Sequence, residues 1–168
     1  MAFGFLFNDD IFISYSREDG GDYVVRLDNE LTKEGYSVFA DHKGTESGEE
    51  PPPTLYSKIR ACKTLVLVAS PMAVAKPKYI ATEVEEFAKS NGTLRIVPIS
   101  FDSREELAVW KDALWWKRVE GKRRLRESHE ALKAGTPSSE VVSRIIEISD
   151  YAKNKDRLRR YRNVALAT

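Results

Sequence analysis

Short, uninterrupted apolar runs recur at intervals along the chain. Strong runs cover residues 10–16, 64–70 and 94–100, and a shorter run covers residues 36–41. Continuous apolar runs of this length are typical of strands that are buried on both faces, as the strands of parallel sheets are. The pattern therefore predicts four buried strands.

Apolar residues at helical spacing fill the intervals between these strands. The spacing predicts a helix over residues 22–33, which Gly35 ends, and a third helix over residues 77–89. A second helix, marked by Leu55, Ile59 and Cys62, is expected to begin no earlier than Thr54, because three prolines precede that position. Strands that alternate with helices indicate an α/β fold with helices on both faces of the sheet, and ligands of such sheets bind at the carboxyl ends of the strands.

The pattern is weaker in the last third of the chain. Residues 104–118 are expected to be helical, with Trp110, Leu114 and Trp115 on a shared face. A further helix is expected to begin near Pro137, because proline and an early acidic residue favour a helix start. Its apolar stripe is expected to be core rather than a cofactor site, and comprises Val141, Ile145, Ile148 and Tyr151.

The helix over residues 77–89 carries one carboxylate on its apolar side. At about 100° per residue, that side comprises Tyr79, Ile80, Val84, Phe87 and Ala88. Glu83 falls among these residues, whereas Glu85 points away from them and Glu86 lies at the margin. Carboxylates are rarely buried without a partner or a task. Glu83 is therefore a candidate functional residue, and the alternative is a glutamate that edges the core and reaches water.

Composition and charge narrow the possible functions. A chain of 168 residues with 42% hydrophobic and 32% charged residues fits one globular domain. A formal net charge of +1 argues against bulk electrostatic binding to nucleic acid, so we expect no nucleic-acid partner. The single cysteine, Cys62, excludes an internal disulfide and fits a cytoplasmic location. Two histidines offer no zinc-ligand spacing, so we expect neither a metal nor a cofactor.

Two segments differ from the rest of the chain. Residues 42–53 form a long loop rich in glycine and proline, and such loops are often lids or contact surfaces. Residues 153–162 hold six basic residues and one acidic residue. We interpret this basic segment as a solvated helix face, and the alternative is a contact with acidic lipid, nucleic acid or another domain. We expect an N-terminal extension over residues 1–8, a domain over residues 9–152, and a basic segment over residues 153–168 that leads into a further region of a longer protein.

The first strand and its neighbours resemble those of a Toll/interleukin-1 receptor (TIR) domain, most of all its bacterial branch. The resemblance lies in Asp10-Ile-Phe-Ile-Ser-Tyr-Ser-Arg-Glu-Asp19, in the helix that ends near Gly35, in Val38-Phe-Ala-Asp41, and in Ser70 at the end of the third strand. It covers roughly residues 9 to 102 and is weak beyond them. It implies a flavodoxin-like three-layer sandwich around a central parallel sheet, with a variable loop after the second strand.

The resemblance also implies an activity. Many bacterial and plant TIR domains cleave NAD+ between nicotinamide and ribose, with a catalytic glutamate four residues after an aromatic residue. Tyr79 and Glu83 have that spacing, although the aromatic residue of the family is usually tryptophan. We therefore expect an NAD+ glycohydrolase that releases nicotinamide and either ADP-ribose or a cyclic product. It would act as an effector of a bacterial immune, antiphage defence or signalling protein.

The resemblance assigns the remaining site residues. The residues expected to bind the substrate are Ser14, Tyr15, Ser16, Arg17, Asp41, Lys43, Ser70 and Tyr79. Arg17 and Lys43 are candidates for the diphosphate, but either could be an ordinary solvated charge. The serines could instead satisfy local backbone groups. The partners implied are NAD+, further copies of the domain bound through contacts that include the 42–53 loop, and further domains of the same chain.

Three other functions fit parts of the pattern. A non-catalytic TIR scaffold that recruits other TIR domains is the main alternative, and Glu83 argues against it. A phospho-receiver domain requires an aspartate at the end of the third strand, where Ser70 stands, so we reject it. A nucleotide-binding domain with a glycine-rich phosphate loop is weakly supported, because the chain has no such glycine spacing.

Overall fold

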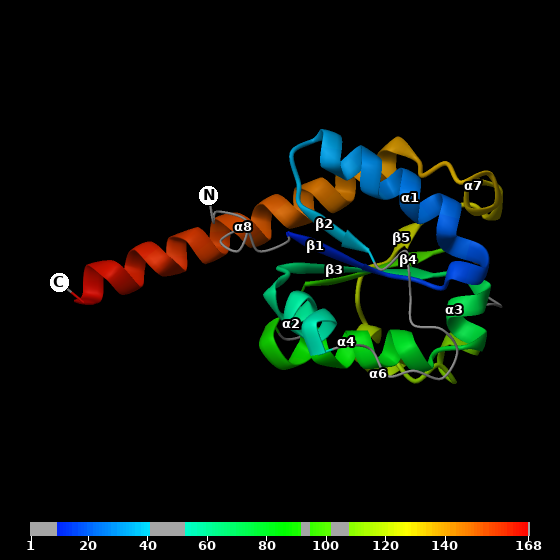
Figure 1. Ribbon diagram of the computed structural model, residues 1–168, viewed down its shortest axis with the longest axis horizontal. Coiled ribbons are helices and arrows are strands. Elements are labelled where there is room, and N and C mark those ends of the chain that lie inside the picture. The colour runs from blue at the N-terminus through cyan, green and yellow to red at the C-terminus, as the bar shows by residue number, and fades with distance from the viewer. Residues whose placement is uncertain (1–9, 41–52, 92–94, 102–107, 168) are drawn as a thin grey trace.

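The computed structural model describes residues 10–40, 53–91, 95–101 and 108–167. One parallel sheet lies at the centre (Figure 1). Its strands are β1 (Ile11–Ser14), β2 (Val38–Ala40), β3 (Thr64–Ala69), β4 (Ile96–Ser100) and β5 (Leu125–Arg126). They lie in the order β2-β1-β3-β4-β5. This is the order of a flavodoxin-like sheet, whose ligands bind where β1 and β3 diverge, so the predicted fold class is confirmed.

Eight described helices connect and cover the strands. They are α1 (Arg17–Lys33), α2 (Pro53–Ala61), α3 (Pro71–Ala75), α4 (Lys78–Asn91), α6 (Trp116–Val119), α7 (His129–Ala134) and α8 (Ser139–Ala167), with a further turn of helix at residues 108–110. Helix α2 begins at Pro53, one residue earlier than expected. Proline is tolerated in the first turn of a helix, where its missing N–H is not needed.

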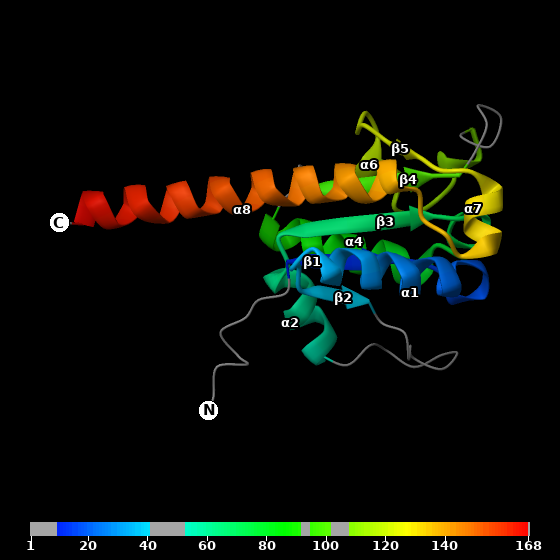
Figure 2. The same ribbon diagram turned by 90° about the horizontal axis from the view of Figure 1, so that it is seen from above.

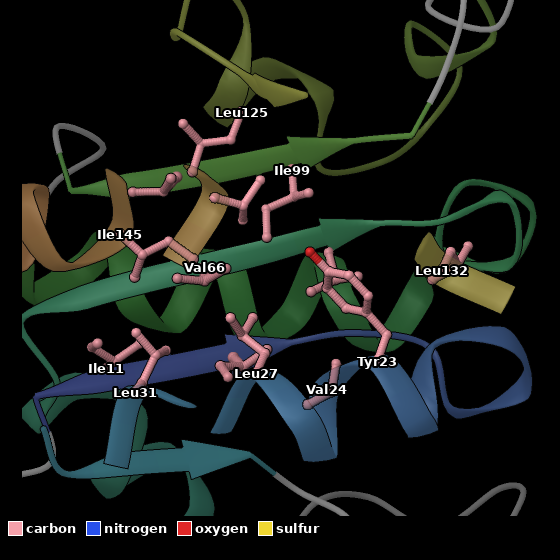
Figure 3. Close-up of a cluster of buried hydrophobic side chains, with 14 of the residues drawn as sticks. Ile11, Tyr23, Val24, Leu27, Leu31, Val66, Ile99, Leu125, Leu132 and Ile145 are labelled. Atoms are coloured by element: carbon pink, nitrogen blue, oxygen red, sulfur yellow. The ribbon is translucent and has the colours of Figure 1, made fainter. Parts of the chain in front are cut away.

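The first helical layer comprises α1, α7 and α8 (Figure 1). Tyr23, Leu27 and Leu31 of α1 are fully buried against strand residues that include Ile11 and Val66 (Figure 3). Burial of side chains of this size contributes roughly 1.5–3 kcal/mol each.

A carboxylate that follows β5 ties this first layer together. Glu127 accepts a hydrogen bond from the Tyr23 hydroxyl and another from the Ser138 backbone N–H, both at 2.9 Å. Burial, together with the charge of Glu127, raises the pKa of Tyr23 above its ordinary value. Glu127 therefore links α1 to the start of α8.

The second helical layer comprises α2, α3, α4 and α6, on the opposite face of the sheet (Figure 1). Its core includes Ile59 of α2, Val84 and Phe87 of α4, and Phe12 and Leu67 of the sheet. Side chains of a strand alternate between its two faces, which explains why Ile11 and Ile13 belong to the first core and Phe12 to the second. Cys62 is fully buried in this second core.

The last third of the chain departs most from expectation. Residues 111–115 form turns rather than a continuous helix, and Leu114 is exposed although Trp110 and Trp115 are buried. Strand β5 and helix α7 carry no strong periodicity and were not predicted. The expected stripe of α8 also ends early, because Tyr151 is exposed and Ala152 is buried in its place.

Helix α8 spans 29 residues and continues without a break across the expected boundary at residues 152 and 153. Its last turns extend well beyond the sheet (Figure 2). Lys153 still belongs to the packed part, because its ammonium lies 3.1 Å from a carboxylate oxygen of Asp10 and 5.0 Å from the ring centre of Tyr36. None of the described helices combines the length and the apolar composition that crossing a membrane requires.

Candidate functional site

Ser14 ends β1, at the carboxyl edge of the sheet. Alternation along the strand places its side chain on the same face as that of Phe12, toward the layer that contains α4. Ser14 is fully buried, so its hydroxyl requires a hydrogen-bond partner. That partner is a carboxylate oxygen of Glu83, which accepts a short hydrogen bond from the Ser14 hydroxyl.

Helix α4 directs Glu83 inward. Ile80, Val84 and Phe87 are buried and define the inner face of the helix, and Glu83 is half-buried among them. Glu85 is exposed, as the helical geometry predicts. Tyr79 departs from the expectation for this face, because 40% of its surface is exposed. It lies in the first turn of α4, one turn before Glu83.

The two neighbouring glutamates of α4 bind cations of other elements. Glu85 accepts two hydrogen bonds from the Arg118 guanidinium of α6, at 2.7 and 2.8 Å. Glu86 accepts one from Lys89 at 2.8 Å and one from Arg60 of α2 at 2.9 Å. These hydrogen bonds hold the pKa of each carboxyl below its ordinary value. Both groups therefore fasten helices together, whereas Glu83 is directed toward the end of β1.

The turn after β3 is held by a residue of α1. Ser70 caps α3 by accepting a hydrogen bond from the Ala73 N–H at 3.3 Å, and its hydroxyl donates to Asp19 at 2.6 Å. The second oxygen of Asp19 accepts from the Met72 N–H at 2.9 Å. The hydroxyl of Ser70 thus builds the turn beside the site. Sequence reasoning quoted Asp19 in the first motif but gave it no role.

The other predicted residues at the start of α1 lie at the same edge. Tyr15 is half-buried against the first core, and Gly20 lies close to its ring. Ser16 is the N-cap residue of α1, but its side chain makes no capping hydrogen bond. Arg17 is exposed in the first turn. Asp41, Lys43 and the rest of the loop up to residue 52 lie outside the described residues.

The carboxyl ends of β1 and β3 therefore bring together a buried serine, an inward carboxylate and a capped turn. A carboxylate offers about four lone-pair sites, so Glu83 can accept further hydrogen bonds while it holds Ser14. An anionic oxygen at such a place can stabilise positive charge that develops on a bound molecule. In the part of the chain that the structure describes, no group of three His, Cys, Asp or Glu side chains could hold a metal ion.

A family model for the TIR domain matches residues 11–133 of this chain. The chain belongs to the TIR-domain family. The match extends beyond the region in which sequence motifs carried the resemblance, and it includes β5 and α7 of the TIR domain. Comparison with curated proteins gave no significant match.

Solved structures agree with this fold. The TIR domains of the activated Roq1 resistosome, which directly recognises the pathogen effector XopQ, superpose with a TM-score of 0.54 at 18% identity, over 83% of this chain and 98% of that one. A diflavin flavoprotein A3 from Nostoc sp. aligns with a TM-score of 0.47 at 15% identity, over 90% of this chain and 96% of that one.

Proposed function

We propose that this TIR domain is an NAD+ glycohydrolase in which Glu83 is the catalytic carboxylate. The observation that carries the proposal is the inward orientation of Glu83 and its hydrogen bond from the buried Ser14, at the carboxyl edge of the sheet. Membership of a family that includes NAD+-cleaving enzymes supports the same assignment.

The chemistry requires few groups. Nicotinamide leaves as a neutral molecule, so its departure needs no general acid, and positive charge develops on the ribose in the transition state. The Glu83 carboxylate would stabilise this charge and accept hydrogen bonds from ribose hydroxyls. Attack by water at the anomeric carbon releases a proton and gives ADP-ribose, whereas attack by a nucleophile of the same molecule gives a cyclic product.

Other residues would position the substrate. The partly exposed ring of Tyr79 lies one helical turn from Glu83, where it could stack on a ring of NAD+. Arg17, Lys43 and Asp41 are proposed to contact the diphosphate and ribose. Ser14 is proposed to act through Glu83, by holding the carboxylate in place. Ser70 is proposed to shape the turn that borders the site.

The proposed setting is a cytoplasmic immune or defence protein of bacterial type that is activated by self-assembly. The TIR domains of Roq1 belong to an activated resistosome, which is an assembly that recognises a pathogen effector. A similar activation of this chain would use the 42–53 loop as a contact between copies. Specific activity should then rise with protein concentration, and a constant value across a broad dilution series would contradict this part of the proposal.

The test is an NAD+ cleavage assay on the full chain at high protein concentration, with products resolved by chromatography. Glu83→Gln is the preferred variant, because its amide oxygen still accepts the Ser14 hydrogen bond and the fold is preserved. Loss of the negative charge should lower nicotinamide release by about 100-fold or more. Glu85→Gln is the matched control, since it removes an exposed glutamate two residues away, and its activity should stay near that of the unmodified chain.

Two results would contradict the assignment. Full activity in Glu83→Gln would remove Glu83 from the chemistry, and equal loss in both variants would show a general effect on α4. An unmodified chain that consumes no NAD+ at any concentration, yet recruits other TIR domains, would support the scaffold alternative.

A further inference from the structure

The projecting part of α8 carries an apolar seam that the fold does not use. Tyr151, Leu158 and Tyr161 are 69%, 69% and 63% exposed. Their spacing of seven and three residues is that of the a and d positions of a coiled coil. Beyond Lys153 the helix runs past the end of the sheet (Figure 2). We refer to these three residues as the α8 seam.

The α8 seam is not a continuation of the face that packs on the sheet. The buried residues of α8 include Val141, Ile145 and Ala152. At about 100° per residue, these residues share one side of the helix, and the seam lies on nearly the opposite side. Burial of the seam would therefore require a second body on the outer side of the helix.

The charges beside the seam select the kind of partner. In a coiled coil with Tyr151 and Leu158 at a positions, Lys155 and Arg162 occupy e positions and Arg157 occupies a g position. Two parallel copies would place Arg157 of one chain opposite Arg162 of the other, and an antiparallel pair would also oppose like charges. Like charges at these positions disfavour pairing, whereas acidic side chains at the same positions complement them.

We propose that the α8 seam binds an acidic amphipathic helix of another protein. The partner helix would cover Tyr151, Leu158 and Tyr161 with its own apolar stripe. Its Glu or Asp side chains would flank that stripe and face Lys155, Arg157 and Arg162. This interaction is independent of the NAD+ site, which lies at the carboxyl ends of the strands.

The probe is a synthetic helical peptide with leucine at the a and d positions and glutamate at the e and g positions. Its control is the same peptide with lysine at the e and g positions. Calorimetric titration of the full chain should detect one-to-one binding of the acidic peptide and no binding of the basic peptide. The Glu83→Gln variant should bind the acidic peptide equally well, which separates this proposal from the catalytic one.

Substitutions distinguish the seam from simple charge attraction. Leu158→Ser should weaken binding of the acidic peptide by at least tenfold. Leu166→Ser is the matched control, because Leu166 is 79% exposed but lies off the seam, and it should leave binding unchanged. The double variant Arg157→Glu and Arg162→Glu should transfer the preference to the basic peptide. Far-UV circular dichroism checks that each variant keeps its helix content.

Several outcomes would overturn the proposal. Binding that survives Leu158→Ser would reduce the interaction to general charge attraction. Binding to vesicles of phosphatidylserine and phosphatidylcholine without binding to the acidic peptide would assign the seam to a membrane surface. A chain that forms dimers through Leu158, as judged by sedimentation of the unmodified chain and of Leu158→Ser, would assign it to a second copy. Absence of binding to every probe would also refute it.

Discussion

The alternation of side chains along β1 explains why a serine lies beside Glu83. Phe12 enters the second core, and Ser14 follows it on the same face, one step closer to the carboxyl edge. At that point the apolar core gives way to the half-buried face of α4. A serine there keeps the strand buried and supplies a hydroxyl to the carboxylate. Each of the two residues therefore satisfies a polar group of the other.

We predict that Ser14→Ala lowers kcat for nicotinamide release by roughly 10- to 100-fold, because a hydrogen bond to a charged group is worth about 1.5–3 kcal/mol. The loss should be smaller than in Glu83→Gln, and KM should change little if Ser14 acts through the carboxylate. Initial rates over a range of NAD+ concentrations separate the two parameters.

Ser149→Ala is the matched control for this variant. Ser149 is also buried, lies on α8, and has no hydrogen-bond partner for its hydroxyl within the described residues. Its substitution should leave kcat unchanged and the free energy of unfolding equal or higher. A comparable loss of kcat in both variants would remove the special role of Ser14.

Glu83 could be found from sequence, and Asp19 could not. The position of Glu83 follows from helical periodicity and the apolar residues around it. The role of Asp19 depends on the close approach of the Met72 N–H and the Ser70 hydroxyl, which come from a different strand and turn. That approach is a consequence of the fold, so no local pattern announces it.

At the scale of elements, hydrophobic pattern predicted what the core demands. The four longer strands and the helices α1, α2 and α4 each bury a periodic set of apolar residues. Strand β5 spans two residues and exists through its pairing with β4, where Ile99 lies opposite Leu125. Helix α7 spans six residues and buries Leu132. Elements this short have too few positions for a periodicity, so only the neighbouring structure defines them.

The end of α7 offers a test of backbone geometry at this scale. Gly135 has φ +64°, and a Cβ atom added there would lie 2.9 Å from the Asp22 Cβ of α1. We predict that Gly135→Ala lowers the free energy of unfolding by about 2 kcal/mol or more, the sum of left-handed strain and steric overlap. Gly121→Ala is the control, because Gly121 has φ +75° with no atom in contact range, and it should lose about 1 kcal/mol. Equal losses in urea unfolding would contradict the role of the α1 contact.

The contact between α2 and α4 predicts a dependence of stability on pH. Hydrogen bonds from Lys89 and Arg60 lower the pKa of Glu86 from its ordinary value of 4.5. A lowered pKa contributes stability at pH values above 4.5, and this contribution is lost as the pH falls through the folded-state value.

We predict that the melting temperature of the unmodified chain falls more steeply than that of Glu86→Gln between pH 5 and pH 3, values chosen to span the ordinary glutamate range of about 4.3. The effect should be small, because this pair lies near solvent. Thermal unfolding followed by circular dichroism, at low and high salt, measures both slopes. Parallel slopes would show that Glu86 gains no stability from its partners.

At the scale of the whole molecule, α8 has two roles along one helix. Its first part packs on the sheet and on α1, and buries residues as far as Ala152. Its second part projects beyond the sheet and carries the basic residues (Figure 2). Sequence pattern identified the change of character but not its position. Lys153 is basic, yet its contacts with Asp10 and Tyr36 make it part of the folded unit.

The position of that change leads to a prediction about truncation. We expect a chain that ends after Asn154 to fold with near-normal stability and to cleave NAD+ at the rate of the full chain at equal concentration, because the residues removed contribute no core contact. A chain that ends after Ser149 should be markedly less stable. It lacks the buried Ala152, the Lys153–Asp10 ion pair, and Asp150, which accepts a hydrogen bond from the Tyr36 hydroxyl. Urea unfolding and the NAD+ assay on both truncations provide the measurement. If the chain that ends after Asn154 stays folded and assembled but loses NAD+ cleavage, the basic segment contributes to the catalytic site and the separation of α8 into two roles is wrong.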